Sequence, residues 1–212
     1  MFKLKEILIV VLFSILLGAL ISLRADFSIL FSSILLGILS FFIVISINII
    51  AKKLAARYLD SSIEIKTWSF KQYWFTSSSH LKNEFPIGIL LPIISTILSL
   101  GYFVWLAVIE FDPSPLSSRV SKRHGLYRFS ELTEIHICLI AAAGVSANLL
   151  LSIPFYLFNF TELAKISIYF AFWNLIPLGN LDGSKIFFGS RIVWISLLII
   201  SAIFLSYALL LV

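Results

Sequence analysis

Six apolar stretches without any Lys, Arg, Asp or Glu constrain this chain more than any other feature of its sequence. A helix needs about 20 consecutive apolar residues to cross the hydrocarbon core of a bilayer, and these stretches come close to or exceed that length. The stretches are Ile7–Leu23, Phe27–Ala51, Phe85–Ile109, Ile135–Thr161, Ile166–Leu181 and Ile192–Val212. With only 13% charged residues, little sequence remains for a soluble domain. We therefore predict an all-α polytopic protein of the cell membrane, in which residues 1–212 form one membrane-embedded domain in contact with membrane lipids.

The positions of the basic residues indicate how the chain crosses the membrane, because Lys and Arg accumulate in cytoplasmic loops. If all six stretches cross, nine of the 16 basic residues lie on the side of the N-terminus and seven lie opposite. If Phe85–Ile109 instead enters and leaves on one face, the division becomes fourteen against two. Pro86, Gly88, Pro92 and Gly101 disfavour a continuous helix there. We therefore expect five or six transmembrane helices. We favour five, together with one re-entrant hairpin and a cytoplasmic N-terminus.

The segment Ser62–Phe70 has the alternation of a half-buried β-strand, because Ile63 and Ile65 are separated by Glu64 and followed by Lys66. Two interpretations remain open. The segment is either an interfacial loop with aromatic residues at headgroup depth or an edge strand that pairs with an extended peptide. Either way, a short β-strand region is expected beside the helices.

Two further features exclude classes of function. Asp112–Gly125, with Pro113, Pro115 and several basic residues, is typical of a solvated loop near anionic lipid, so no nucleic-acid partner is expected. The single cysteine, Cys138, excludes an internal disulfide and a thiol-based metal cluster.

A candidate site lies where the fifth apolar stretch ends, in the segment Asn174–Gly183. Pro177 and Gly179 interrupt the helix there, and Asp182 follows the interruption. An acidic residue so close to hydrocarbon is costly and usually has a partner, a metal or a wet cavity. An ordinary turn, which Asn, Asp and Gly also favour, is the structural alternative.

Two other polar groups accompany this segment. Within Ala143–Asn148 the small residues permit close helix packing, and Asn148 needs a hydrogen-bonding partner. In Asn48–Tyr58 the residue Lys52 lies at the end of the second stretch, where lysines ordinarily extend toward the headgroups.

Together these three groups resemble the site-2 protease family of intramembrane zinc metalloproteases, above all its compact archaeal members. NLIPLGNLDG is similar to the family's N-x-x-P…LDG segment, with Asn174, Pro177 and Asp182 at its characteristic positions. AGVSAN resembles A-G-P-x-x-N, with Asn148 retained and Val145 where proline is usual. The order of elements agrees over nearly the whole chain. The resemblance implies a core built around Asn148, Asn174, Pro177 and Asp182, in which the Asp is a zinc ligand near the cytoplasmic face.

The chain departs from this family at the HExxH motif, whose two His bind zinc while the Glu acts as general base. Alignment of the motif places Asn48 and Lys52 at the two His and Ile49 at the Glu, and Ala56 matches an alanine that commonly follows. Isoleucine cannot transfer a proton, and a lysine ammonium has no lone pair for zinc. No two of the chain's three histidines are four residues apart.

We therefore predict a non-catalytic, site-2-protease-like membrane protein that binds or regulates transmembrane segments or another membrane protein. No cofactor is expected. If Asn48, Lys52 and Asp182 converge, a Lys52–Asp182 ion pair takes the place of the metal. The alternative is an active zinc-dependent intramembrane metalloprotease with an unorthodox site. A small transporter or lipid-binding protein is less well supported, because the apolar stretches contain few ionisable residues.

Overall fold

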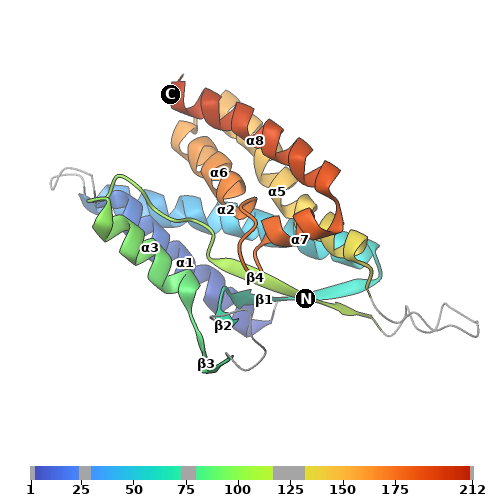
Figure 1. Cartoon of the computed structure of the whole chain (residues 1–212). Helices are drawn as coiled ribbons and strands as arrows, with labels where there is room; N and C mark the ends of the chain where they lie inside the picture. Colours follow the sequence, from blue (N-terminus) through green and yellow to red (C-terminus); the bar gives the residue numbers. More distant parts are fainter. Residues whose placement is uncertain (1–2, 24–29, 73–79, 117–131, 211–212) are drawn as a thin grey trace, which may run out of the picture.

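The computed structural model describes residues 3–23, 30–72, 80–116 and 132–210, which are mostly helical (Figure 1). Within these ranges, four helices are long and apolar enough to cross a membrane. They are α1 (Leu4–Ser22), α2 (Leu30–Tyr58), α5 (Glu134–Leu157) and α8 (Arg191–Leu210). The predicted fold class is confirmed in its coarse form: the chain is predominantly helical and carries the helices of a membrane protein.

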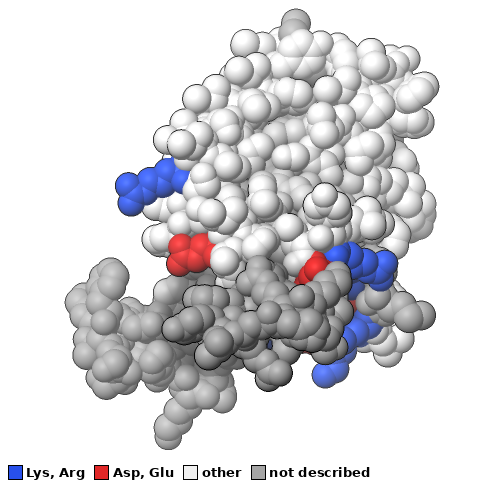
Figure 2. All heavy atoms as spheres, turned by 90° about the vertical axis from the view of Figure 1, so that its right-hand side faces the viewer, with Lys and Arg blue, Asp and Glu red and all other residues white. Residues whose placement is uncertain are grey.

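The outward surfaces of these helices are apolar, as contact with lipid requires. On α8, Ile192 and Leu210 expose 81% and 82% of their surface, and extensive apolar patches of this kind are rare in soluble monomers. Figure 2 shows that the charged side chains of the face in view lie in its middle and lower parts, while its upper part is uncharged. This separation suits a protein whose apolar part lies in hydrocarbon.

The fifth predicted span, Ile166–Leu181, differs from the helix observed. Helix α6 (Thr161–Asn174) begins five residues earlier and ends before Pro177, and α7 (Asp182–Gly189) begins after the interruption. The α-helical region is disfavoured for the residue before a proline, which explains why α6 does not continue through this segment. With 14 residues, α6 is about 21 Å long and is shorter than the roughly 30 Å of a hydrocarbon core.

The segment Phe85–Ile109 folds back on itself, as the prediction of a hairpin requires. It runs upward as α3 (Ile87–Leu98) and returns as extended chain (Figure 1). Leu100 and Gly101 make the reversal, with φ angles of 52° and 84°. Glycine adopts this left-handed region without strain, whereas leucine does so at a cost.

The two ends of this hairpin meet at Trp68. The backbone N–H of Gly88 donates to the Trp68 carbonyl over 2.9 Å, and the Trp68 N–H donates to the Val108 carbonyl over 3.0 Å. A Cβ added to Gly88 would lie 2.5 Å from the Val108 oxygen, so the close approach requires glycine. The chain therefore enters and leaves the hairpin at one end of the molecule.

Two short antiparallel pairs of strands complete the fold. β1 (Ser61–Thr67) pairs with β4 (Ile109–Pro115), and β2 (Phe70–Gln72) pairs with β3 (His80–Phe85). The β1–β4 register sets Ile65 opposite Phe111. The strand predicted within Ser62–Phe70 is therefore present, and its partner on one side is the chain itself rather than a bound peptide.

The loop predicted at Asp112–Gly125 is wrong at its start, because Asp112 to Pro115 belong to β4. Ile109, Glu110 and Phe111 are all buried, so this end of the strand belongs to the core. Residues 117–125 of the predicted loop lie outside the described residues.

Helix α2 lies at the centre of the arrangement. It packs against α1 on one side and against α5 on the other, and α5 in turn contacts α6 and α7. The β1–β4 pair lies where the two groups of helices meet (Figure 1). The positions aligned with the protease motif are thus on a helix that packs against other helices on two sides.

Candidate functional site

The α2 positions aligned with HExxH face the interior of the protein. Asn48, Ile49 and Lys52 expose 3%, 1% and 2% of their surfaces. They lie on one side of the helix, because a turn takes 3.6 residues and positions 48, 49 and 52 are spaced one and four apart. A lysine so completely enclosed needs a counter-charge.

Asp182 supplies that counter-charge from the first turn of α7. The interrupted segment after α6 lets the chain turn back, and Gly183 approaches the end of α6 so closely that an added Cβ would lie 2.2 Å from the Leu175 carbonyl oxygen. Asp182 is fully buried.

Lys52 and Asp182 form a buried ion pair, in which Nζ lies 2.6 Å from Oδ2. The side chains expose 2% and 0% of their surfaces. The convergence on which the predicted ion pair depended is therefore observed for these two residues.

Helix α5 makes room for the lysine with a glycine. A Cβ added to Gly144 would lie 2.6 Å from Cε and 2.9 Å from Cγ of Lys52, and 3.0 Å from Nδ2 of Asn48. The close helix packing that the small residues of AGVSAN predicted is therefore present at Gly144. The Lys52 side chain runs past this glycine to reach Asp182.

Several polar atoms around the pair have no hydrogen-bond partner within the described part of the chain. They are Nδ2 of Asn48, both amide atoms of Asn148, and both carboxylate oxygens of Asp182, of which Oδ2 has the ion pair with Lys52. Asn148 lies one turn beyond Gly144 on α5, and its backbone carbonyl accepts a hydrogen bond from Ser167 over 2.8 Å. Buried polar atoms normally have hydrogen-bond partners. This centre therefore contains more buried polar atoms than the described residues satisfy.

Two residues that sequence reasoning missed enclose the pair. The Phe111 ring from β4 lies with its centroid 5.3 Å from the Lys52 Nζ and 3.9 Å from the Lys185 Nζ, both favourable cation–π distances. The Lys185 ammonium also donates to the Phe111 carbonyl. Burial, opposed in part by Asp182, lowers the pKa of Lys185 to about 8. The alternation of Ile109 and Phe111 could have revealed the strand, but Asp112 and two prolines concealed it.

Asn174 and Pro177, the other predicted core residues, lie in the same segment but act differently. The Asn174 side chain is buried and donates to the Phe170 carbonyl of its own helix over 2.8 Å. Pro177 is exposed, between α6 and α7. These residues shape the end of α6, and within the described part of the chain neither side chain pairs with Lys52 or Asp182.

The residues at this centre do not fit a catalytic zinc ion. Such a site needs three protein ligands, normally His, Cys, Asp or Glu, and no group of three lies together within the described residues. Asp182 is a suitable ligand, but a lysine ammonium holds it. His136 contacts Thr133 at the start of α5, and the side chains of His80 and His124 lie outside the described part.

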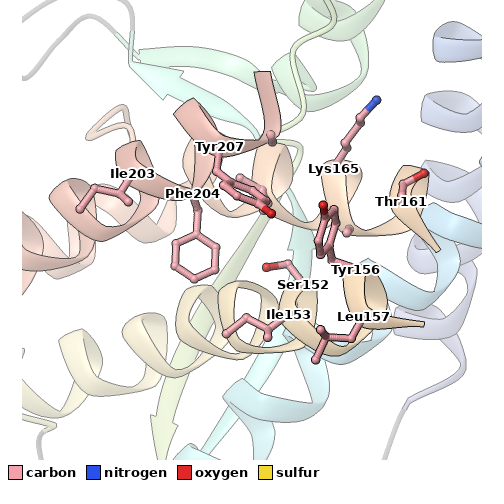
Figure 3. Close-up of a pocket in the computed structure, with 12 residues that line it drawn as sticks. Ser152, Ile153, Tyr156, Leu157, Thr161, Lys165, Ile203, Phe204 and Tyr207 are labelled. Carbon is pink, nitrogen blue, oxygen red and sulfur yellow. The ribbon is translucent and has the colours of Figure 1, made fainter. Parts of the chain in front are cut away.

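A cavity with a volume of about 300 Å³ lies among α5, α6 and α8, away from the Lys52–Asp182 pair. Ile153, Leu157 and Phe204 give it an apolar lining, and the rings of Tyr156 and Tyr207 meet edge to face at 5.5 Å (Figure 3). The lining residues do not include the ion pair. The cavity is a gap between apolar helices and contains no arrangement of catalytic groups.

Comparison of the chain with models of protein families, with curated proteins and with solved structures gives no match.

Proposed function

We propose that this chain is a multi-pass membrane protein with the architecture of the site-2 proteases, which binds transmembrane segments of other membrane proteins without hydrolysing them. Its N-terminus lies on the cytoplasmic side, and the Phe85–Ile109 hairpin re-enters the membrane. The distribution of basic residues supports this orientation, and the meeting of the hairpin's two ends supports re-entry.

The Lys52–Asp182 pair is the observation that carries the proposal. In the family that the chain resembles, a metal cation neutralises the aspartate. Here an ammonium lies 2.6 Å from the same carboxylate. The ion pair joins α2 to α7, and Ile49, which cannot accept a proton, occupies the position of the general base.

Restoration of the motif tests this proposal. The triple variant Asn48→His, Ile49→Glu, Lys52→His is expected to bind about one zinc ion per chain, because two His and Asp182 would provide three ligands. Adding Asp182→Ala should abolish that binding. Metal content is measured by mass spectrometry of the purified proteins, and the unmodified chain is expected to hold no stoichiometric zinc.

Binding and hydrolysis are then separated in liposomes. A labelled single-span protein is reconstituted with the unmodified chain, and association is followed by energy transfer while the products are resolved on a gel. We expect association without cleavage. Zinc that depends on Asp182 in the unmodified chain, or cleavage products from it, would instead establish the metalloprotease alternative. Absence of association with every span tested would contradict the binding function.

A further inference from the structure

The outer edge of β1, on the side away from β4, presents a defined set of backbone groups. Ile63 pairs with Pro113, which has no N–H, so this pair cannot exchange two hydrogen bonds. Because hydrogen-bonded and non-hydrogen-bonded pairs alternate in an antiparallel ladder, Ile63, Ile65 and Thr67 direct their N–H and C=O groups outward. This is the set of groups that an added strand would use.

Glu6 of α1 is seated on this edge. Its Oε1 accepts the outward N–H of Ile65 over 3.3 Å, and its Oε2 lies 2.5 Å from Nζ of Lys53 on α2. The same Oε2 accepts the backbone N–H of Lys3 over 2.8 Å at the start of α1. Glu6 exposes 3% of its surface and the Lys53 side chain 14%. A carboxylate and its cation are thus held together at the middle of the open edge.

A groove of about 550 Å³ runs beside Glu6 along the same edge. Its lining includes Ile65 and Thr67 of β1 and Ser69 and Pro86 beyond them. Three lysines, Lys3, Lys5 and Lys66, also line it, against two carboxylates, Glu6 and Glu64. When the Glu6 carboxylate leaves the edge, three lysines line the groove against the single carboxylate of Glu64, although Lys3 pairs with Glu64 and Lys66 pairs with Asp112. This excess of positive charge suits a ligand with negative charge.

We propose that the outer edge of β1 binds an extended peptide segment with an acidic residue, and that Glu6 is the intramolecular stand-in for that residue. This inference depends on the proposed binding function and names the chemistry of the partner. The incoming strand pairs with Ile63, Ile65 and Thr67, and its carboxylate replaces that of Glu6 opposite Lys53.

The burial of Lys53 explains why the partner must be acidic. If a neutral peptide displaced Glu6, Lys53 would lose the nearest carboxylate in a position where its side chain exposes only 14% of its surface. Removing one partner of a partly buried charge pair is unfavourable. A peptide carboxylate restores the pair, so discrimination between Glu and its neutral amide Gln arises at this position.

The test uses the full chain in detergent micelles and two labelled peptides as long as β1, seven residues. The peptides are identical β-formers except for a central Glu or Gln, and binding is measured by fluorescence anisotropy. We expect the Glu peptide to bind more tightly. Glu6→Ala should strengthen its binding about tenfold, because an internal competitor is removed. Lys53→Gln should abolish the preference for Glu, and Lys165→Gln, remote from this groove, should change neither value.

Glu6→Gln is a control for the possibility that Glu6→Ala disrupts the start of α1. The glutamine amide oxygen can still accept a hydrogen bond from the Ile65 N–H, but the side chain no longer carries a charge. It is expected to strengthen binding of the Glu peptide less than Glu6→Ala does. Hydrogen exchange at the Ile65 amide should slow when the peptide binds to either variant. Equal binding of the two peptides, or weaker binding to both Glu6 variants, would overturn the proposal. If transmembrane spans still associate in that case, the binding function itself stands and only this site is wrong.

Discussion

Two ion pairs in this molecule have the same length and very different surroundings. Lys52–Asp182, between α2 and α7, and Lys66–Asp112, across β1 and β4, both have an N–O distance of 2.6 Å. The first exposes 2% and 0% of its side chains, whereas the second exposes 52% and 49%. Distance alone therefore does not rank these contacts. Burial decides their importance, because removal of one partner leaves a charge in low dielectric only at the first site.

The largest effect is expected at the buried pair. Lys52→Ala should lower the free energy of unfolding by about 3–5 kcal/mol, because Asp182 is left as an uncompensated buried charge. The measurement is equilibrium unfolding in mixed micelles. Lys52→Met combined with Asp182→Leu should recover most of the loss, since neither charge of the pair then remains. A double variant as unstable as Lys52→Ala would show that packing, rather than charge, determines stability here.

An intermediate effect is expected for Lys53, the neighbour of Lys52 in sequence. Its ion pair with Glu6 is partly exposed, with 14% and 4% of the side-chain surfaces accessible. Lys53→Ala should therefore lower stability by about 1.5–3 kcal/mol, the range for a hydrogen bond to a charged group. Equal shifts of the melting temperature for Lys52→Ala and Lys53→Ala would contradict the importance assigned to the buried pair.

Gly144 offers a test of the space around Lys52. The added methyl group of Gly144→Ala would overlap Cε and Cγ of the lysine, at 2.6 and 2.9 Å. We expect a loss of about 1–3 kcal/mol, typical of overpacking. The same substitution in a Lys52→Ala background should cost clearly less, because the overlapping atoms are gone. Additive losses in this double-mutant cycle would place the clash elsewhere.

The smallest effect is expected on the sheet. Lys66→Gln should change stability by only about 0.2–1 kcal/mol, because both charges of the pair are hydrated already. The difference between Lys66→Gln and the unmodified chain should vanish in about 1 M salt, where the Debye length is about 3 Å. The Lys52→Ala difference should persist in that salt. A persistent Lys66 effect would mean that the sheet encloses this pair.

Much of the fold could be predicted because hydrophobic length is a local property. The apolar stretches identified α1, α2, α5 and α8, and the unfavourable residues of Phe85–Ile109 indicated the reversal that Leu100 and Gly101 make. The end of α6 and the strand β4 were placed less well. Pro177 near the end of α6, and Pro113 and Pro115 in β4, are local signals that disfavour regular structure. Where each element ends depends also on packing between distant residues, which the sequence does not show.

The candidate site divides in the same way. The motif alignment identified Asn48, Ile49, Lys52 and Asp182 as positions of one centre. Sequence reasoning missed Phe111 and Lys185 because their roles depend on contacts between elements far apart in the chain. Glu6, which reaches across to β1 and α2, carried no signal in the sequence beyond an acidic residue near the start of a helix.

By itself, the sequence determined that the chain carries helices long and apolar enough for a membrane. It also determined that the positions aligned with HExxH hold an amide, an isoleucine and a lysine. Those are properties of residue type and spacing, which local chemistry limits strongly. Only the tertiary structure decided that Lys52 meets Asp182 across three helices and that Glu6 covers the edge of β1. Such contacts join distant residues through close packing, and the energy of a charge depends on how completely that packing excludes water.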